Sequence, residues 1–491
     1  MQLPISINPG RRSSLQRQIF EQVVTLIDAG ILRAGDPLPG SRTLGEQLGV
    51  ARNTVTLAYA ALAREGFVET RDRHRARVAE RLPREFLASR RRFAQLPRSG
   101  PERRPEPLRF GPWRGPLLYD PASDRLRFDF RLGRPDRTLF PHRQWHKLAN
   151  EHLHRAAVSL TDYGDPLGLR ELRAAIAETV RVARGIHCCA EQVCVVAGVQ
   201  EGLNLVARLL LQPGMTVLSE NPSYASAVGV WKFYGANLVA APVGAEGLDA
   251  GALPAAGARL AYVTPSHQFP LGPTMSLTNR LGLLEWARRN GAFIVEDDYD
   301  GDFRYQGSPL QALAALDRSE RVIYLGTFSK SLGAGLRLGY AILPPSLVPD
   351  ARAVKDLYDH GHAWLDQAVL ADFIRSGAYE AHLRRIRRVY LERRDSLLQA
   401  LRQSFGAVQV WGLEGGMHLS WQMPPDWPDA AELRRRLLDR GVGLYTLTAG
   451  PASLLQPFAG WDRYALLGFS CLKPTEIGEA VAHIAAAVAE D

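Results

Sequence analysis

GTFSKSLGAGLR, residues 326–337, is the stretch that decides the fold of this chain. Its Lys330 is one of five lysines among 60 basic residues, in a chain that otherwise uses arginine. A lysine amine forms a Schiff base with an aldehyde, and an arginine guanidinium does not. The hydroxyls of Thr327 and Ser329 and the guanidinium of Arg337 suit a phosphate. The stretch therefore predicts an anchor for pyridoxal 5'-phosphate (PLP); a Ser-Lys pair in a polar surface loop is the alternative.

Short apolar segments alternate with amphipathic ones on both sides of this lysine. The clearest are QVCVVAG (192–198), MTVLSE (215–220), ARLAYVTP (258–265), AFIVEDD (292–298) and RVIYLGTFS (321–329). Strands joined by helices favour an α/β domain with a mainly parallel sheet. Ligands of such sheets lie at the carboxyl ends of the strands, so we expect the site there.

Polar residues follow several of these segments. Asp297 and Tyr299 lie two residues apart at the end of a predicted strand, so alternation places them on one side. A carboxylate there suits the ring nitrogen of PLP, which it keeps protonated, and a tyrosine suits the phenolic oxygen. A Mg²⁺ site or a solvated acidic cluster is the alternative for residues 296–300. Tyr224 can stack on a planar ring, and His267 or Gln268 can reach the phenolic oxygen.

The N-terminal segment predicts a winged helix-turn-helix. Residues 15–29 show helical spacing, Ser41 is the predicted N-cap of a short helix, and 49–51 form a tight turn before a second helix over 52–64. Residues 66–79 read as a hairpin. The second helix of such a motif enters the major groove of DNA. The predicted DNA-binding residues are Arg42, Arg52, Asn53, Thr54, Thr56, Arg71, Arg73 and His74.

Charge and composition support this division of the chain. Residues 1–110 hold 20 arginines, no lysine and 11 acidic residues, so their net charge is +9 and the rest of the chain is neutral. Such asymmetry indicates a polyanionic partner for the first segment. We predict a DNA-binding domain over 1–80, an Arg/Pro-rich linker over 81–125, read as a solvated tether, and a large body over 126–491.

Several classes of protein are not expected. No apolar run approaches the ~20 residues that span a bilayer, so we expect no membrane partner. Four cysteines lack the paired spacing of a zinc site and supply no disulfide framework, so we expect no metal and a cytoplasmic location.

Two families resemble the two parts of the chain. Residues 12–80 resemble the winged helix-turn-helix of the GntR family, with Leu38-Pro39-Gly40-Ser41-Arg42 leading into the second helix. The wing departs from the family because RDRHRAR replaces its usual glycines. Residues 126–490 resemble fold-type I aminotransferases, with a smaller C-terminal α/β subdomain, in the order Tyr163-Gly, Gly198-x-Gln, Asn221-Pro-x-Tyr, His267, Asp297-x-Tyr and Ser329-Lys-x₆-Arg. The whole chain is similar to regulators of the MocR/GabR type.

The resemblance implies a role for each matching residue. Lys330 carries the PLP aldimine, Asp297 rather than Asp298 faces the ring nitrogen, Tyr299 faces the phenolic oxygen and Tyr224 stacks on the ring. The implied phosphate-binding groups are Ser329 or Thr327, Arg337 and the backbone of Val199 and Gln200. Tyr163 is expected to reach in from the partner of a homodimer.

One departure concerns the ligand. The aminotransferase arginine that holds a substrate carboxylate begins a late strand, and Leu466 stands at that place here, with Arg463 as an alternative anchor. We therefore expect a PLP-dependent regulator that senses a small amine or PLP itself, rather than an enzyme. An active aminotransferase with an autoregulatory DNA-binding domain is the alternative.

Overall fold

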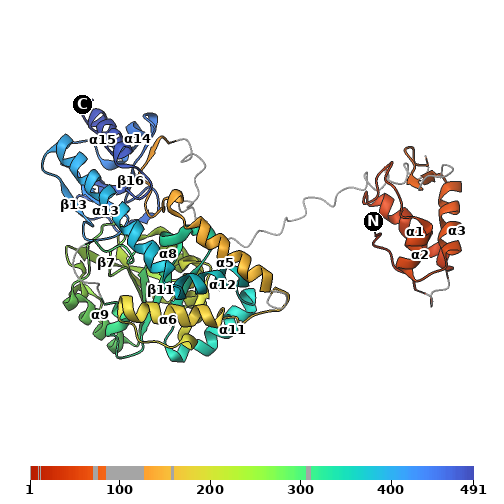
Figure 1. The fold of residues 1–491 in the computed structure, drawn as a ribbon, viewed down its shortest axis with the longest axis horizontal. Coiled ribbons are helices and arrows are strands. Elements are labelled where there is room, and N and C mark those ends of the chain that lie inside the picture. Colours follow the sequence, from red (N-terminus) through yellow and green to blue (C-terminus); the bar gives the residue numbers. More distant parts are fainter. Residues whose placement is uncertain are drawn as a thin grey trace. The chain divides into compact units, whose positions relative to one another are not determined.

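The computed structural model describes residues 2–8, 10, 13–69, 76–83, 126–155, 160–305 and 311–490. The chain forms two compact units, residues 1–109 and 110–491, so their division falls within the predicted linker (Figure 1). Arg71, Arg73 and His74, predicted at the tip of the wing, lie outside the described residues.

The described residues of the N-terminal unit form three helices and a short hairpin. Their bounds are α1 Leu15–Asp28, α2 Ser41–Leu48, α3 Arg52–Arg64, β1 Val68–Glu69 and β2 Arg77–Val78. The strands are antiparallel, with Val68 opposite Val78. Apolar side chains from all three helices, among them Ile19, Leu44 and Val55, are fully buried in one core. Helix α3 has the predicted bounds because its apolar residues recur at helical spacing and pack on α1 and α2.

The predicted N-cap of helix α2, Ser41, is wrong by one residue. Helix α2 begins with Ser41 itself, and Gly40 is its N-cap without a side-chain hydrogen bond. The Ser41 hydroxyl instead accepts a hydrogen bond from Arg52 Nε at 3.3 Å, which links the two helices of the motif. Gly49 ends α2 in the left-handed conformation (φ 65°), which accounts for the predicted turn.

The body is built on one large sheet with strand order β4-β12-β11-β10-β9-β5-β7-β8. The strand bounds are β4 Val193–Val196, β5 Thr216–Asn221, β7 Asn237–Gly244, β8 Gly247–Leu248, β9 Ala258–Val263, β10 Phe293–Asp298, β11 Val322–Thr327 and β12 Gly339–Ile342. Strands β7, β5, β9, β10 and β11 pair in parallel, while β12 is antiparallel to both of its neighbours. The mainly parallel α/β sheet is confirmed.

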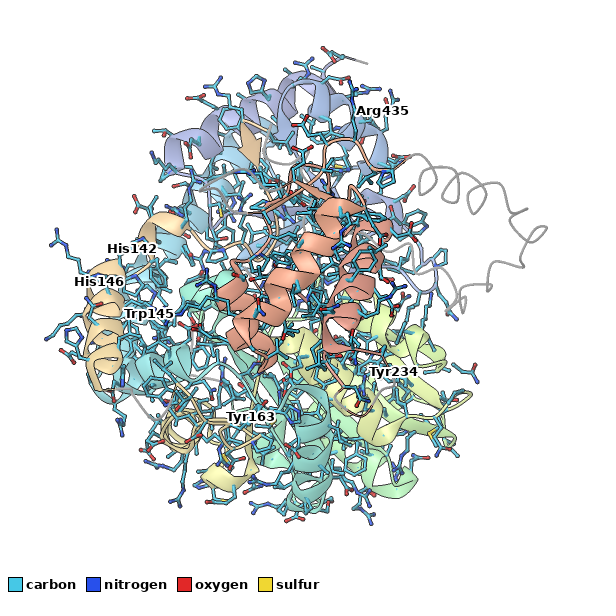
Figure 2. All side chains as sticks on the ribbon, turned by 90° about the vertical axis from the view of Figure 1, so that its right-hand side faces the viewer. His142, Trp145, His146, Tyr163, Tyr234 and Arg435 are labelled. Carbon is cyan, nitrogen blue, oxygen red and sulfur yellow. The ribbon has the colours of Figure 1, made fainter. Side chains whose placement is uncertain are left out.

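Helices cover both faces of this sheet. The helix bounds are α5 His142–Arg155, α6 Arg170–Arg184, α7 Val199–Leu210, α8 Ala225–Phe233, α9 Leu277–Asn290, α10 Leu313–Leu316, α11 Val348–Asp359 and α12 Trp364–Arg375. Side chains of α7, α8 and α11 pack with one face, and those of α6, α9 and α12 pack with the other. His142, Trp145 and His146 lie along α5 (Figure 2). Because helices cover both faces of the sheet, every residue of β10 is buried, and its three acidic residues stand at its carboxyl end.

A smaller subdomain follows the large sheet. Its bounds are α13 Ala378–Phe405, β13 Gln409–Trp411, β14 His418–Gln422, α14 Ala430–Asp439, β15 Val442–Gly443, β16 Tyr445–Thr446, β18 Tyr464–Gly468 and α15 Pro474–Val488. Its four-stranded sheet, β13-β14-β18-β16, is antiparallel. Strand β3 (Phe128–Asp129), at the start of the body, pairs with β15, so this subdomain is not formed by the C-terminal residues alone.

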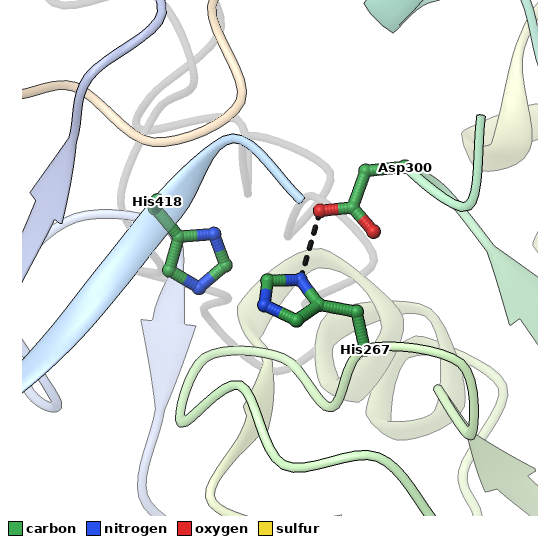
Figure 3. Close-up of side chains that lie close together, drawn as sticks. All are labelled: His267, Asp300 and His418. Carbon is green, nitrogen blue, oxygen red and sulfur yellow. Dashed lines mark hydrogen bonds and ion pairs between the residues drawn. The ribbon is translucent and has the colours of Figure 1, made fainter. Parts of the chain in front are cut away.

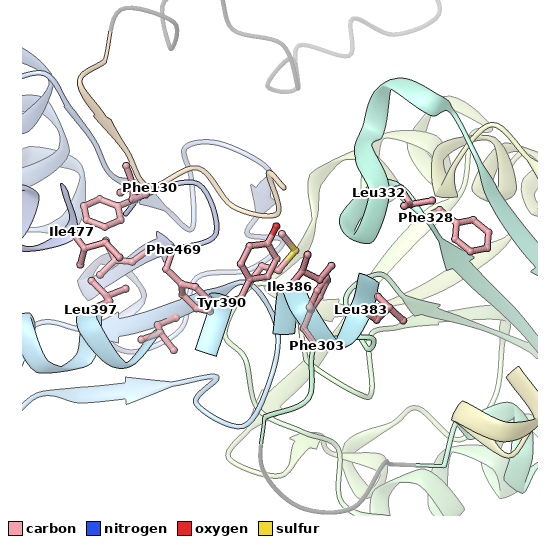
Figure 4. Packing of buried hydrophobic residues seen from close by; sticks show 14 of the residues in the cluster. Phe130, Phe303, Phe328, Leu332, Leu383, Ile386, Tyr390, Leu397, Phe469 and Ile477 are labelled. Atoms are coloured by element: carbon pink, nitrogen blue, oxygen red, sulfur yellow. The ribbon is translucent and has the colours of Figure 1, made fainter. Parts of the chain in front are cut away.

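The long helix α13 joins the two parts of the body. Its side chains Leu383, Ile386, Tyr390 and Leu397 lie in a continuous apolar cluster that extends from Phe328 beside β11 to residues of the smaller subdomain (Figure 4). The short strands β6 Ser223–Tyr224 and β17 Ala452–Ser453 form a second connection. Both connections border the carboxyl ends of the large sheet.

Candidate cofactor site

A cavity of ≈ 180 Å³ lies at the carboxyl ends of β9, β10 and β11. Its lining brings together nine of the eleven residues predicted for the cofactor. These are Val199, Gln200, Tyr224, Asp297, Tyr299, Thr327, Ser329, Lys330 and Arg337. Segments up to 138 residues apart in the sequence therefore meet at one sheet edge, as the parallel strands require.

Lys330 lies in the single turn Ser329–Gly333 that follows β11. Its Nζ donates a hydrogen bond to the carbonyl of Gly133 at 2.9 Å. Gly133 has φ 65°, which favours glycine, and a Cβ there would lie 2.7 Å from Nζ and displace the amine. Burial lowers the pKa of Lys330, against the raising effect of Asp300 and Asp297. A lowered pKa increases the fraction of neutral amine, the form that attacks an aldehyde.

Asp297 ends strand β10 on the cavity side. Its Oδ2 accepts a hydrogen bond from Tyr262 Oη at 2.7 Å, while its Oδ1 is buried and has no partner among the described residues. Burial raises the pKa of Asp297 to about 7. A buried carboxylate oxygen without a donor is costly, and the protonated ring nitrogen of PLP is a donor that would satisfy it.

The neighbouring carboxylates have other partners. Asp298, on the opposite side of β10, bonds Arg184 Nε at 2.8 Å and Tyr324 Oη at 2.5 Å. Glu296 accepts from the backbone N–H groups of Leu313 and Ala314. The acidic run 296–300 is therefore not a solvated cluster, since all four of its carboxylates, that of Asp300 included, are buried and serve different neighbours.

The phosphate end of the predicted site is built from a helix start and an arginine. Helix α7 begins at Val199, and the first N–H groups of a helix have no partner within it. The guanidinium of Arg337 donates to the carbonyl of Ala197 just before this helix. Gly198 between them has φ 84°, and a Cβ there would lie 3.2 Å from Arg337 Nη2. Arg337 itself has φ 52°, which is uncommon for a residue with a Cβ. A helix N-terminus beside a guanidinium fits a phosphate.

His267 lies behind the cavity rather than in its lining. Its Nδ1 is 2.9 Å from Tyr299 Oη. The same nitrogen is 2.9 Å from Asp300 Oδ2 (Figure 3). This ring nitrogen thus contacts both the tyrosine hydroxyl and the carboxylate. His267 therefore positions the tyrosine that faces the cavity.

In the part of the chain that the structure describes, two clusters of histidine and carboxylate side chains have the composition of metal sites. His267 and Asp300 lie beside His418, whose Nε2 is 2.9 Å from the carbonyl of Pro270 and whose pKa is lowered to about 3, chiefly by burial. In the second cluster Lys355 Nζ lies between Glu201 and Asp359, with His362 3.4 Å away. The ammonium supplies the positive charge that a metal would bring.

Tyr163 lies at the surface and does not line the cavity of its own chain (Figure 2). It is 87% exposed, and its ring centroid is 5.3 Å from that of His360. Its predicted route to the site through a partner subunit stays a prediction.

Several lining residues were not predicted from the sequence. They are Leu132, Gly133, Gly198, Tyr262, Thr264, Phe269, Ala334 and Pro451. A signal existed for Tyr262, which is the one aromatic residue of strand β9. Strand β9 pairs with β10 so that Tyr262 lies opposite Val295. Asp297 is two residues further along on the same face.

The alternative anchor for a ligand carboxylate, Arg463, has another partner. Arg463 Nη1 donates to the carbonyl of Trp427, and Arg463 is not among the cavity lining. Leu466 is fully buried in β18, between β14 and β16.

Among the described residues, no helix is both long and apolar enough to cross a membrane.

Comparisons with known proteins agree with this architecture. Residues 134–483 match the family Aminotransferase class I and II, and residues 15–78 match the bacterial regulatory proteins of the gntR family. The chain is 38% identical over 392 residues to the probable rhizopine catabolism regulatory protein MocR of Rhizobium meliloti, which covers 79% of this chain and 77% of that protein. It is 33% identical to the HTH-type transcriptional regulator TauR of Rhodobacter capsulatus, over 99% of this chain and 100% of that protein.

A solved structure shares the fold of the body. It is LysN, an α-aminoadipate aminotransferase of Thermus thermophilus complexed with N-(5'-phosphopyridoxyl)-L-leucine, with a TM-score of 0.65 and 27% identity over 76% of this chain and 97% of that chain. The predicted fold and family are confirmed. The chain belongs to the MocR-type transcriptional regulators, which join a GntR-type DNA-binding domain to a class I and II aminotransferase domain.

Proposed function

We propose that this regulator binds PLP covalently at Lys330 and that occupancy of the site by PLP, or by a small amine bound to it, controls DNA binding. One observation carries the proposal. A single cavity contains an amine of lowered pKa, the unpartnered oxygen of Asp297 and the guanidinium of Arg337. These groups match the aldehyde, the ring nitrogen and the phosphate of PLP, which supplies an electron-withdrawing ring when bound.

The remaining lining residues have roles consistent with a flat aromatic ligand. Tyr224 and Phe269 are in contact edge to face, with centroids 5.6 Å apart, and Tyr224 offers a face for stacking. Tyr299, positioned by His267, offers its hydroxyl to the phenolic oxygen. Ser329 and Thr327 lie beside the arginine, where their hydroxyls supplement the phosphate contacts.

Regulators with a GntR domain bind DNA, and we propose that α3 enters the major groove here. Arg52, Asn53 and Thr56 are exposed on α3, and Thr54 is half-buried. Arg42 on α2 is paired with Glu46 at 3.0 Å, but both side chains are largely exposed, so a DNA phosphate can take the place of the carboxylate. The double-stranded partner fits the concentration of positive charge in residues 1–110.

We further propose that the body forms a homodimer through the surface around Tyr163. Leu357 is 87% exposed and Tyr358 is 51% exposed next to His360, which contacts Tyr163. Arg208 lies 4.8 Å from the centre of the Tyr358 ring. Large exposed apolar side chains gathered in one area indicate an interface. A Leu357→Lys substitution should shift the mass measured by light scattering from that of a dimer to that of a monomer. A wild-type protein that already has the mass of a monomer would contradict the proposal.

The proposed function is tested on the purified full-length protein by absorbance and by DNA binding. Addition of PLP should produce a visible absorption band, and the affinity for a duplex selected from a random library should change with PLP, or with PLP and an amine. No band would remove the cofactor from the proposal. Catalytic release of keto acid from amino acids would instead favour an active aminotransferase, an alternative that the presence of both Lys330 and Asp297 supports.

A further inference from the structure

The cavity has few positive charges. Among the described residues that line it, only Lys330 and Arg337 are cationic. Under the proposed function the amine of Lys330 serves the aldehyde of PLP and the guanidinium of Arg337 serves its phosphate. No lining cation is then left for a carboxylate on the ligand that the regulator senses.

The wall toward the smaller subdomain is apolar. Leu132, Phe269 and Pro451 line the cavity there. Behind them Leu466, which is fully buried, packs in one apolar cluster with Leu132 and Phe269. A carboxylate against this wall would lose its hydration without gaining a partner, which is strongly unfavourable.

The arginines near this wall have other contacts. Arg463 donates to the carbonyl of Trp427, and Arg434 donates to the carbonyl of Leu444 and lies over the ring of Tyr445. Arg131 lies close enough to Lys330 to lower its pKa, yet it is not part of the cavity lining. Of these, Arg131 is the group that could compensate a ligand carboxylate by moving.

We propose that the effector of this regulator is a primary amine without a carboxylate, whose uncharged remainder lies against Leu132, Phe269 and Pro451. The inference rests on the proposed function, because the amine is sensed at PLP. It excludes common amino acids as effectors and selects amines whose only charged group is the reacting nitrogen.

The test compares matched pairs that differ by one carboxylate. The PLP-loaded full-length protein is titrated with isopentylamine and leucine, phenethylamine and phenylalanine, and tyramine and tyrosine. The readouts are the visible absorption of the bound cofactor and the shift of the melting temperature. We expect each amine to reach half of its effect at a concentration at least tenfold below that of its amino acid.

The possible outcomes separate this inference from the function on which it rests. Amino acids that act at concentrations equal to or below those of the amines overturn the inference and leave the PLP sensor intact. A visible band that responds to neither class also overturns it and leaves PLP itself as the effector. No visible band with PLP removes the proposed function, and the inference with it.

Variants of the wall sharpen the result. Leu466→Arg should lower the preference for amines about tenfold or reverse it, while Leu466→Met, a control of similar size, should preserve it. If Leu466→Arg does not fold, the wild-type titration still decides. Arg131→Gln should leave the preference unchanged, and a selective loss of amino-acid binding in that variant would show that Arg131 holds a carboxylate, contrary to the proposal.

Discussion

Two lysines enclosed by the same domain have opposite environments. Lys330 faces a cavity, donates to one backbone carbonyl, and has a pKa lowered chiefly by burial. Lys355 is 1% exposed; burial also lowers its pKa, but Glu201 and Asp359, both bonded to its Nζ, raise it above the usual value. The neighbours of each lysine therefore decide whether it is a nucleophile or one half of an ion pair.

Exchange of each lysine for a neutral side chain tests this distinction most directly. Lys330→Ala should abolish the visible band that PLP produces in the wild type, because no other amine faces the cavity among its described lining residues. Lys355→Met should retain the band if the protein is folded. A band that persists in Lys330→Ala and disappears in Lys355→Met would show that PLP binds to Lys355, contrary to the proposal.

Substitution of Lys355 should have a large effect on the stability of the protein rather than on the binding of PLP. Removal of one partner from a buried pair leaves an uncompensated charge and typically costs about 3–5 kcal/mol. Lys355→Met should therefore lower the free energy of unfolding by about that amount, measured by urea denaturation of the cofactor-free protein. The double variant Lys355→Met/Glu201→Gln should recover part of the loss, because it also removes one of the two carboxylate charges that Lys355 compensates. Equal stability of wild type and Lys355→Met would show that the pair is solvated.

The acid opposite Lys330 predicts a dependence of stability on pH. Burial raises the pKa of Asp297 to about 7, above the ~3.9 of an unfolded aspartate. Between these values the folded protein holds a proton that the unfolded chain has lost, so this group's contribution to stability falls as the pH rises to about 7. Asp297→Asn carries no such loss. Its stability relative to the cofactor-free wild type should therefore increase by about 2–3 kcal/mol between pH 5 and pH 8.

The pH comparison has an internal control. Burial also raises the pKa of Glu296 to about 7, and this group titrates in both proteins, so its contribution cancels in the difference. A difference between wild type and Asp297→Asn that stays constant with pH would mean that Asp297 is ionised throughout. The same variant should weaken PLP binding, since the ring nitrogen loses its carboxylate.

Substitution of Arg337 should have the smallest of these effects, a weaker binding of PLP. Hydrogen bonds to charged groups contribute about 1.5–3 kcal/mol each, so Arg337→Met should raise the Kd for PLP roughly 10- to 100-fold. Lys330 remains in place, so the visible band should still form at saturating PLP. Arg337→Lys keeps the charge and should lose less affinity. An unchanged Kd in both variants would place the phosphate elsewhere.

The sequence predicted the features that depend on local periodicity. Alternation along a strand put Asp297 and Tyr299 on the same side, and both line the cavity. Helical spacing gave the bounds of α3 without error. Ser41 shows the limit of local rules, because its hydroxyl has a partner eleven residues away, on Arg52, that competes with capping.

Contacts between distant segments could not be derived from one sequence. Tyr262 reaches Asp297 because β9 and β10 are neighbours, and the strand order is a property of the whole sheet. Lys355 and Glu201 are 154 residues apart, and nothing in the intervening chain indicates that they meet. The pairing of β3 with β15 is of the same kind, since it returns the start of the body to a subdomain formed much later.

Helix α13 connects the segment around Lys330 to the smaller subdomain. Near its first turn Tyr379 Oη is 2.9 Å from Ser331 Oγ, and His382 Nε2 is 2.8 Å from the Ser331 carbonyl, next to the lysine that anchors the proposed cofactor. Toward its other end Leu397 and Leu401 are fully buried in the core shared with the smaller subdomain. Its 28 residues span about 42 Å, so a tilt of about 3° at the cofactor end would move the far end by about 2 Å. A small rotation of α13 at Ser331 would thus be transmitted to the smaller subdomain, which packs on the far end of the helix.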